Sequence, residues 1–412
     1  MLKRIRRIHD RLLFNDMGPV ISTGLKRLIG PEDLPGLPPR LDPRGGEPDL
    51  SAVPVSTPVR FLVGIMRVMR RDFALVLGLG LLTLAFELAS PLLVRRLLAT
   101  ISETVRGEGY FLLAAGSAVA LCFVNLAAAI SRQHLFDQML QSEQRVVNGL
   151  NVRIYRHALR LTRNAKSATP VGDLVNHMST DADSISQLPI VVPEFLTNIV
   201  TLVAVVGLLV WLLGPAGLVA VAVLVVLLPV TRYVARRVVA LDETIMARRD
   251  ERVSLMSQVV SGIRIVKYFA WEPRFKLEIE ALRSQELSAR RRLLATESFS
   301  LLFYAGTTTI MAVASFGTYL ALGGTLDASL VFSCIFLFQL LQNPFGGLPE
   351  LITQLAAARV AAGRLNKFLT KETYVAGDRT ATHGPGRVSV ELESVSVRYP
   401  EAAEDALSGL TF

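Results

Sequence analysis

Charged residues are scarce in this sequence. They make up 19% of its 412 residues, whereas soluble domains carry about 25%. Hydrophobic residues reach 51% and gather in long blocks, so the composition disfavours large soluble helical domains and favours a chain embedded in a membrane. The net charge of +9 does not indicate nucleic-acid binding, because the basic residues stand between the apolar blocks, as they do in membrane proteins.

Cysteine is nearly absent as well. Cys122 and Cys334 both lie within apolar blocks, and they provide neither a disulfide framework nor the spacing of a metal site. His134, His157 and His177 are too scattered to suggest metal ligands, and no Ser-His-Asp set is recognisable. The sequence therefore predicts no metal site and no catalytic residues.

The N-terminal stretch MLKRIRRIHDRLLF is basic but lacks the continuous apolar run of a secretory signal. Its apolar residues recur at helical spacing, opposite four arginines. This pattern fits a helix that lies on an anionic membrane surface, and equally an ordinary basic helix in solvent.

The long apolar blocks predict an all-α polytopic membrane protein. Crossing the hydrocarbon core takes about 20 residues of helix, and six blocks are long enough. They lie near residues 73–95, 109–131, 190–212, 216–235, 297–320 and 329–349.

Two connections between these spans, residues 132–189 and 236–296, are much longer than the others. Both keep helical periodicity, and structureless segments of that length are improbable in a folded domain. We therefore expect the spans to continue as helices beyond the membrane. Gly172, after Pro170, is predicted to mark the turn in the first connection, and Pro273 the turn in the second.

Lysine and arginine predict the orientation. Seven lie in 132–189 and fourteen between residues 232 and 296, whereas the links 213–215 and 321–328 have none. By the positive-inside rule, the long connections and both chain termini are cytoplasmic.

The last residues differ from all others. In VSVELESVSVRYP, apolar and polar residues alternate with the period of half-buried strands. A short β-strand fragment is therefore predicted at the C-terminus, after an otherwise helical chain.

Four stretches together resemble the exporter-type ATP-binding-cassette (ABC) transporters of the multidrug-resistance-protein (C) subfamily. RDERVSLMSQVVSGIRIVKYFAWEPRF is similar to the second intracellular helix and coupling segment of that subfamily. LQNPFGGLPELITQLAAARVAAGRLNKFL resembles its sixth span and cytoplasmic exit. GDLVNHMSTDADSI resembles its first coupling segment, and FNDMGPVISTGLKRLIGPEDLPGLPPRLDP its N-terminal lasso segment.

The resemblance implies the type 1 transmembrane fold of ABC exporters, with six spans and long cytoplasmic helical extensions. It divides the chain into a lasso-like segment, an elbow helix, the transmembrane domain, a linker, and the first strands of a nucleotide-binding domain; these cover residues 1–57, 58–72, 73–370, 371–387 and 388–412. It also implies ATP and Mg as cofactors. The expected partners are an ABC ATPase domain, a second transmembrane half in a homo- or heterodimer, the lipid bilayer of the plasma membrane, and a small-molecule substrate.

The motifs that bind and hydrolyse ATP are missing from these 412 residues. No Gly-Lys pair exists, so there is no glycine-rich phosphate loop, and the signature and Walker B motifs of the family are absent too. The sequence alone is therefore not expected to hydrolyse ATP. It fits the membrane half of an exporter of amphipathic or anionic molecules that lacks its motor. The alternatives are a non-functional truncated remnant or gene-model fragment, and the membrane half of a split transporter with a separate ATPase subunit.

By resemblance, Tyr399 matches the aromatic residue that stacks on adenine, although a strand aromatic packed on neighbouring residues explains it as well. Asn176, Ser179 and Asp181 are expected to cap helix ends and to bind the ATPase domain. An aromatic cluster in the second turn suits a pocket of that partner, or packs within its own bundle, and an acidic neighbour pairs with a basic group of the partner. These residues are Tyr268, Phe269, Trp271 and Glu272.

A few polar residues interrupt the spans and are candidates for a substrate pathway. Glu87 lies mid-span in the first helix, where a carboxylate is costly unless it faces water or a partner. Gln339, Gln342 and Asn343 crowd the sixth span beside Pro344, and the two glutamines are expected to share a face. Hydrogen bonding between helices is the alternative for all three amides.

Overall fold

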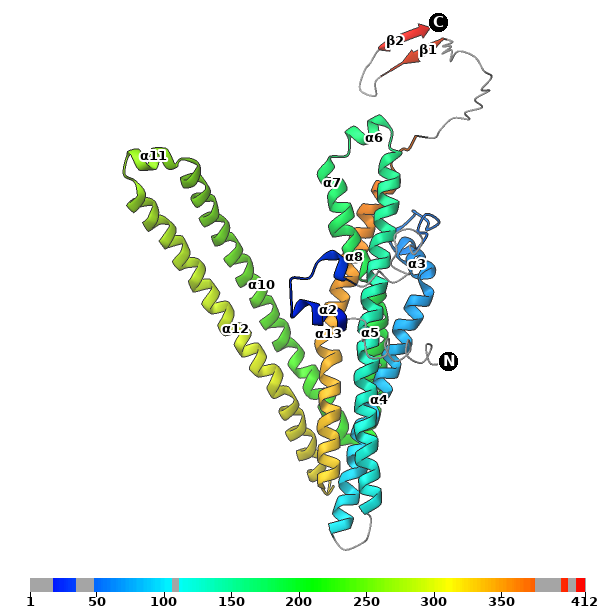
Figure 1. Ribbon diagram of the computed structural model, residues 1–412. Coiled ribbons are helices and arrows are strands. Elements are labelled where there is room, and N and C mark those ends of the chain that lie inside the picture. The colour runs from blue at the N-terminus through cyan, green and yellow to red at the C-terminus, as the bar shows by residue number, and fades with distance from the viewer. Residues whose placement is uncertain (1–17, 35–47, 106–110, 375–393, 399–404, 412) are drawn as a thin grey trace. The chain divides into compact units, whose positions relative to one another are not determined.

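The computed structural model describes residues 18–34, 48–105, 111–374, 394–398 and 405–411. This part of the chain is mostly helical, with a two-stranded sheet near the C-terminus (Figure 1). It forms two compact units. Unit 1 comprises Met1–Leu79, Gln133–Glu194 and Leu351–Phe412, and unit 2 comprises Gly80–Arg132 and Phe195–Glu350.

Helices dominate both units. The long ones are α4 Arg70–Val105, α5 Phe111–Leu159, α9 Leu188–Leu213, α10 Gly217–Ser261, α12 Glu272–Ala321 and α13 Ala328–Leu369. The short ones are α2 Gly18–Gly24, α3 Pro58–Val68, α6 Arg163–Ser167, α7 Val171–Asn176, α8 Ala182–Ser186 and α11 Ile263–Tyr268. A π-helical turn, His177–Asp181, joins α7 to α8.

Among the described residues, five continuous helical stretches are long and apolar enough to cross a membrane. They are Arg70–Ser102, Phe111–Leu159, Val171–Ser261, Glu272–Ala321 and Ala328–Leu369. The third stretch contains both α9 and α10, which a single 3-10 turn, Gly214–Ala216, divides. Each of the six predicted spans therefore lies largely within a helix.

Glycine makes the turn between α9 and α10 possible. Gly214 has φ +58°, which residues with a side chain rarely adopt. A Cβ atom on Gly217 would lie 2.5 Å from the carbonyl oxygen of Leu209, so only glycine permits α10 to start this close to the end of α9. The two helices pack tightly because of this turn.

The core of unit 1 joins segments that are distant in sequence. Phe61 and Ile65 on α3 are fully buried together with Leu150 and Ile154 on α5 and Leu365 on α13. Burying a side chain of this size contributes about 2 kcal/mol, so α3 is held by its apolar face. The side-chain oxygen of Thr57, which accepts a hydrogen bond from the Arg60 amide, caps its start.

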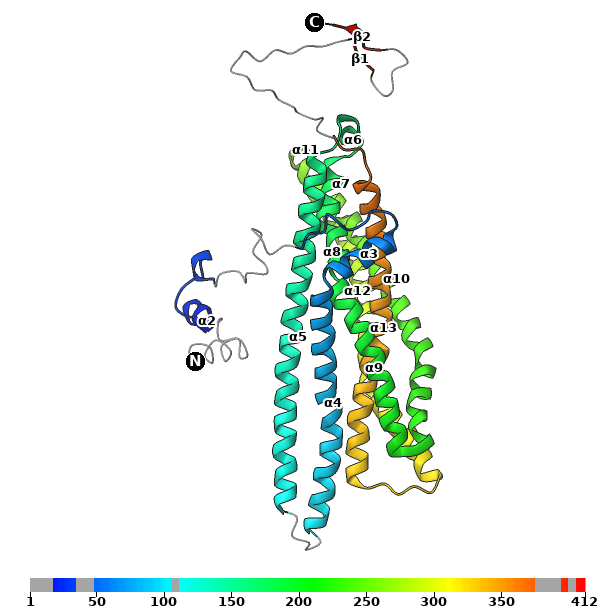
Figure 2. The same cartoon turned by 90° about the vertical axis from the view of Figure 1, so that its right-hand side faces the viewer.

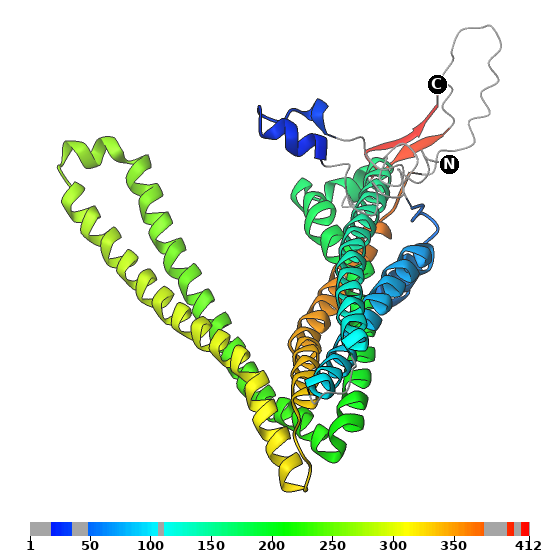
Figure 3. The same ribbon diagram turned by 60° about the horizontal axis from the view of Figure 1, so that its bottom comes forward.

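Unit 2 has a core of its own and a long helical pair. Leu209, Met311 and Phe338 are fully buried in the core that α9, α10, α12 and α13 share. Beyond it, α10 and α12 run side by side and are joined through α11 (Figures 1 and 3). A small apolar cluster that includes Ile245 and Leu293 holds this pair together.

Polar contacts join α4 and α5 within unit 2, where the two helices lie side by side (Figure 2). The hydroxyls of Thr83 and Ser131 are 2.8 Å apart and buried, and Ser90 donates to the side-chain oxygen of Asn125 at 3.1 Å. Such contacts are common between helices in membranes, because each satisfies a polar group that lipid cannot.

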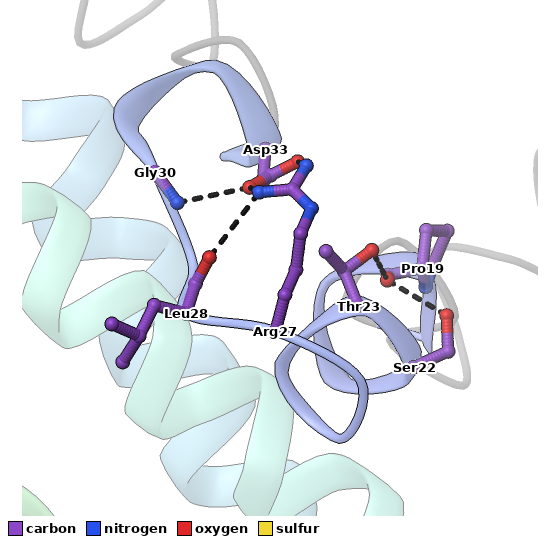
Figure 4. A network of polar contacts seen from close by, with 7 residues as sticks. All are labelled: Pro19, Ser22, Thr23, Arg27, Leu28, Gly30 and Asp33. Atoms are coloured by element: carbon purple, nitrogen blue, oxygen red, sulfur yellow. Dashed lines mark hydrogen bonds and ion pairs between the residues drawn. The ribbon is translucent and has the colours of Figure 1, made fainter.

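The N-terminal described segment forms a compact loop (Figure 4). The Arg27 guanidinium binds both carboxylate oxygens of Asp33 at 2.6 and 2.7 Å. Asp33 also accepts a hydrogen bond from the Gly30 amide, and the hydroxyls of Ser22 and Thr23 donate to the Pro19 carbonyl. These bonds shape residues 18–34 locally.

The predicted C-terminal β fragment is confirmed in part. Two antiparallel strands, β1 Val395–Val397 and β2 Leu407–Leu410, pair with each other. Val395 lies opposite Leu410 and Val397 opposite Leu407, so the register shifts between these two pairs. The first predicted strand, near residues 388–392, lies outside the described residues.

Candidate functional site

The first long connection turns through α6. Helix α5 ends at Leu159, the side-chain oxygen of Thr162 accepts from the Ala165 amide at the start of α6, and α7 begins at Val171 after Pro170. The predicted short turn is present. Its expected marker, Gly172, is the second residue of α7, because proline fixes the backbone before a helix and the turn is complete by Pro170.

This first turn is anchored to the chain that leaves α13. The Lys371 ammonium donates to the Thr169 hydroxyl at 2.6 Å, and the Thr162 amide donates to the Glu372 carbonyl. The Tyr374 amide donates to the Arg160 carbonyl at 2.6 Å. A movement of residues 371–374 would therefore pull directly on the turn.

Asp181 is the buried polar centre of unit 1. Its side chain is only 2% exposed, and it accepts hydrogen bonds from Nε of Arg364 at 2.9 Å and from Nδ1 of His177 at 2.7 Å. The rings of His157 and His177 both pack against Phe368. Arg364 was not predicted from the sequence as a site residue, although it stands in the AAGRLNKFL segment that carries the family resemblance.

The capping role expected for the first turn was wrong. Neither Asn176 nor Asp181 makes a side-chain cap hydrogen bond, because the backbone stays helical at both positions and offers no free helix end. Asn176 and Ser179 are exposed, and the Ser179 hydroxyl donates to the Val175 carbonyl of its own helix. Asp181 faces inward.

The second connection turns at α11, and Pro273, expected to mark this turn, is the second residue of α12. Tyr268 is 87% exposed, Phe269 63% and Trp271 45%. The rings of Phe269 and Trp271 stack with centroids 5.0 Å apart. The cluster therefore presents a large apolar surface at a helix turn.

Glu272 is bound within its own segment. Its carboxylate lies 2.9 Å from the Lys267 ammonium, and the hydrogen bond from Lys267 lowers the pKa of Glu272. The Lys267 side chain is 67% exposed and that of Glu272 is 41% exposed, so this pair contributes little to stability. The pair places one positive and one negative charge beside the aromatic cluster.

A buried carboxylate fastens α10 to α12 farther along the pair, well before the predicted span 297–320. Glu286 on α12 binds Arg283 and Arg252 at 2.8 Å and Arg249 at 3.7 Å. The hydrogen bond from Arg283 and that from Arg252 lower the pKa of Glu286. Glu286 therefore stays ionised and keeps the two helices together.

Within the predicted spans, Glu87 on α4 forms an ion pair with Arg132 on α5. In the predicted spans, Glu87 lies in the middle of the first and Arg132 just beyond the end of the second. Because the two side chains pair, the end of the second predicted span lies beside the middle of the first, so α4 and α5 are offset along their axes. Long charged side chains can extend along an apolar surface, so the position of a charged residue in the sequence does not locate the end of a span.

The amides of α13 bond across to α12. Gln342 is buried, donates to the Tyr304 carbonyl, and accepts from the Thr308 hydroxyl at 3.0 Å. Asn343 accepts from the Tyr304 hydroxyl at 3.3 Å. Gln339, one helical turn away, is exposed. Interhelical hydrogen bonding, the alternative role, is what the structure shows for Gln342 and Asn343.

A cavity of about 300 Å³ lies beside these amides in unit 2. Its apolar walls come from α10 and α13, and its polar groups include Thr231, Arg232, Tyr304 and Gln342. A mostly apolar cavity with a few polar groups fits a small amphipathic molecule. The two charged residues of the lining, Arg232 and Glu350, have opposite signs.

The comparison with known proteins agrees with this architecture. Residues 73–345 match the family described as the ABC transporter transmembrane region. The chain belongs to this family.

Among the curated relatives of this ABC membrane chain, a multidrug resistance protein (fer6) of Mycosarcoma maydis is 31% identical over 78% of the chain and 25% of that protein. The human ATP-binding cassette sub-family C member 3 is 28% identical over 78% of the chain and 21% of its own length. Human sub-family C member 2 is 27% identical over 74% and 20%. The chain spans a quarter or less of these relatives.

The sequence made two predictions about cofactors, one on adenine stacking by Tyr399 and one on metal ligands. Tyr399, the candidate for adenine stacking, lies outside them. Within the described ranges, no group of three His, Cys, Asp or Glu side chains is arranged to hold a metal ion. ABC transporters use ATP and Mg through their nucleotide-binding domains, and the expected role of Tyr399 stays a prediction.

Replacing Gln342 by leucine tests the amide contacts of the ABC membrane fold. We expect the free energy of unfolding to fall by about 1 kcal/mol, because the Tyr304 carbonyl and Thr308 hydroxyl lose their partner. Unfolding in mixed micelles measures the change. The exposed Gln339→Leu is the matched control, and an equal loss in both variants would contradict the assignment.

Proposed function

We propose that this chain is the transmembrane half of an ATP-driven ABC exporter, with six membrane-spanning helices and two cytoplasmic helical turns that receive motion from ATPase domains. The observation that carries the proposal is the exposed aromatic cluster at α11. Exposed Tyr and Trp side chains are typical anchors of protein interfaces. Here they stand at the tip of the α10–α12 pair.

The pairs of long helices supply the mechanical part of the mechanism. Glu286 on α12 binds Arg249 and Arg252 on α10, so a force applied at α11 moves both helices together. In unit 1, the contacts of Lys371 and Tyr374 tie the first turn to the chain that follows α13. Closure of ATPase domains on the two turns would then change the opening of the membrane domain.

The first turn offers a different surface from the second. Asn176 and Ser179 are exposed there and would contact the ATPase domain, while Asp181 supports them from within through Arg364. Phe269, Trp271 and Glu272 would complete the contact at the second turn. A second transmembrane half, as a homo- or heterodimer, supplies the remaining helices of the pathway.

We propose that the substrate is a small amphipathic or anionic molecule. The cavity beside Gln342 combines apolar walls with polar groups, Arg232 and Glu350 among them, and this mixture supports an amphipathic molecule. Glu87, Gln339 and Asn343 are further candidates for the pathway. Among these, Glu87 is already neutralised by Arg132, which permits its burial in a membrane.

Cysteine labelling tests the orientation. After both native cysteines are replaced by alanine, Ser179→Cys and Phe269→Cys are expected to react with a membrane-impermeant maleimide only from the cytoplasmic side. Leu322→Cys, in the short link before α13, is expected to react only from the outer side. Labelling of residues 179 or 269 from outside would overturn the proposal.

Transport in vesicles tests the function itself. The chain is reconstituted with and without a supplied ABC ATPase domain and its second half, and ATP-dependent uptake of carboxyfluorescein, an amphipathic anion, is measured. Uptake is expected only when the ATPase domain and ATP are both present, because the residues of this sequence include no phosphate loop. Equal uptake without ATP would contradict an ATP-driven exporter.

A further inference from the structure

A cavity lined by arginines lies at the beginning of α4 in unit 1. Its volume is about 450 Å³, and α3, α4 and α5 all contribute to it. The lining residues are Val68, Arg70, Arg71, Asp72, Leu75 and Arg145. We propose that this cavity binds the phosphate headgroup of an anionic phospholipid.

The charge of the lining favours an anion. Three arginines face one aspartate, which leaves a net charge of +2. Asp72 is nearly buried and accepts a hydrogen bond from Arg145 at 2.6 Å. Arg70 and Arg71 are exposed, and neither forms an ion pair with any residue that the structure describes. Both guanidinium groups are therefore available to a phosphate.

Arg145 itself has capacity for a further acceptor. Its Nε is buried, and it finds no hydrogen-bond partner among the described residues. A buried donor without a partner is unfavourable, so an oxygen atom that reached it would be favoured. Arginine also binds phosphate oxygens through two parallel N–H groups, which makes it the usual residue for such sites.

The surroundings distinguish a lipid from a soluble anion. Val68 and Leu75 are exposed apolar residues on the wall of the same cavity. The apolar part of α4 begins at Phe73, directly after the arginines. Helix α3 buries Phe61 and exposes Val63, as does a helix that lies at a membrane surface. In a molecule with a phosphate and an acyl chain, the phosphate would contact the arginines of the lining and the acyl chain would contact Val68 and Leu75.

The location agrees with this ligand. The arginines precede the first predicted span on its cytoplasmic side, where bilayers carry most of their anionic lipids. The first turn of α4 adds the positive end of a helix dipole. The site depends on membrane insertion and on the proposed orientation, but it requires neither an ATPase domain nor transport.

Lipid binding to the purified full chain in detergent micelles tests the site. Dioleoyl phosphatidylglycerol and dioleoyl phosphatidylcholine are titrated separately, and native mass spectrometry counts the bound molecules. We expect the first phosphatidylglycerol to bind at least about tenfold more tightly than phosphatidylcholine, because two arginines near a lipid surface each attract an anionic headgroup. The double variant Arg70→Gln with Arg71→Gln is expected to lose this preference. Both side chains are exposed, so the variant should unfold at the same temperature as the wild type in the absence of added lipid.

The matched control removes two charges from the same region without touching the cavity. Arg60 and Arg67 are exposed on α3, and neither lines the cavity. Arg60→Gln with Arg67→Gln is expected to keep the preference within about twofold, because these residues lie outside the cavity. If general surface charge attracted the lipid, this variant would lose the preference as well. Glycerol 3-phosphate is expected not to displace the lipid. An unchanged preference in the Arg70/Arg71 variant, an equal loss in the control, or displacement by glycerol 3-phosphate would each overturn the assignment.

Discussion

Replacing Asp72 by alanine is expected to lower the free energy of unfolding by about 3 kcal/mol, because it leaves Arg145 as an unpaired charge in a largely buried position. The Asp72 side chain is 6% exposed and that of Arg145 is 20% exposed. Asp72 also lies in the first turn of α4, where a negative charge favours the helix. Unfolding in mixed micelles measures the loss.

Two controls separate the buried pair from charge in general. Arg274→Ala removes an exposed pair with Glu278 and is expected to change stability by less than about 0.5 kcal/mol. Replacing both buried partners, with Asp72→Leu and Arg145→Met, is expected to cost less than Asp72→Ala alone, because no charge is then left unpaired. A loss below about 1 kcal/mol in Asp72→Ala would contradict the buried-pair interpretation.

Much of the helical architecture can be predicted from apolar blocks. The predicted span 190–212 lies within α9, and the predicted span 216–235 starts beside the first residue of α10. The helix ends in the two long connections are different. Helices α5, α10 and α12 continue far beyond the apolar blocks, and their periodicity indicates this continuation without locating each turn.

The contacts at the candidate site were harder to predict. Asp181 and Arg364 are 183 positions apart, and a single sequence gives no signal that one side chain binds the other. Asp181 was therefore assigned to a cap, the usual role of an aspartate near a turn. The pair of Glu87 with Arg132 was missed for the same reason.

For the aromatic residues of the second turn, the sequence left open both a surface for a partner and packing within the bundle. Tyr268, Phe269 and Trp271 are exposed, because they lie at and directly after the end of α11, where few neighbours can cover them. The amides of α13 differ in burial although they are close on the helix. Helical spacing placed Gln339 and Gln342 on one face, but close packing against α12 buries only Gln342. Side-chain packing between helices decided that difference.

Replacing Tyr268 by alanine is expected to weaken the association with a supplied ABC ATPase domain at least tenfold, and to reduce ATP-dependent uptake in parallel. Tyr268 is the most exposed ring of the cluster, and aromatic anchors at interfaces contribute about 2 kcal/mol or more when truncated. Binding of the ATPase domain to the reconstituted chain, measured by titration, gives the affinity. Because the ring is 87% exposed, the variant should unfold at the wild-type temperature, which separates a lost contact from a lost fold.

A neighbouring exposed residue provides the matched control. Leu277 lies on α12 beyond the turn and is 69% exposed, so Leu277→Ala removes exposed apolar area of the same helical pair without touching the aromatic cluster. Its affinity for the ATPase domain is expected to stay within about twofold of the wild type, since interface energy concentrates in a few anchors. Trp271→Ala is expected to act in the same direction as Tyr268→Ala, and it also releases the stacked ring of Phe269. If Tyr268→Ala and Leu277→Ala weaken binding equally, the cluster is not the contact surface, and force from the ATPase domain would have to enter through another part of the α10–α12 pair.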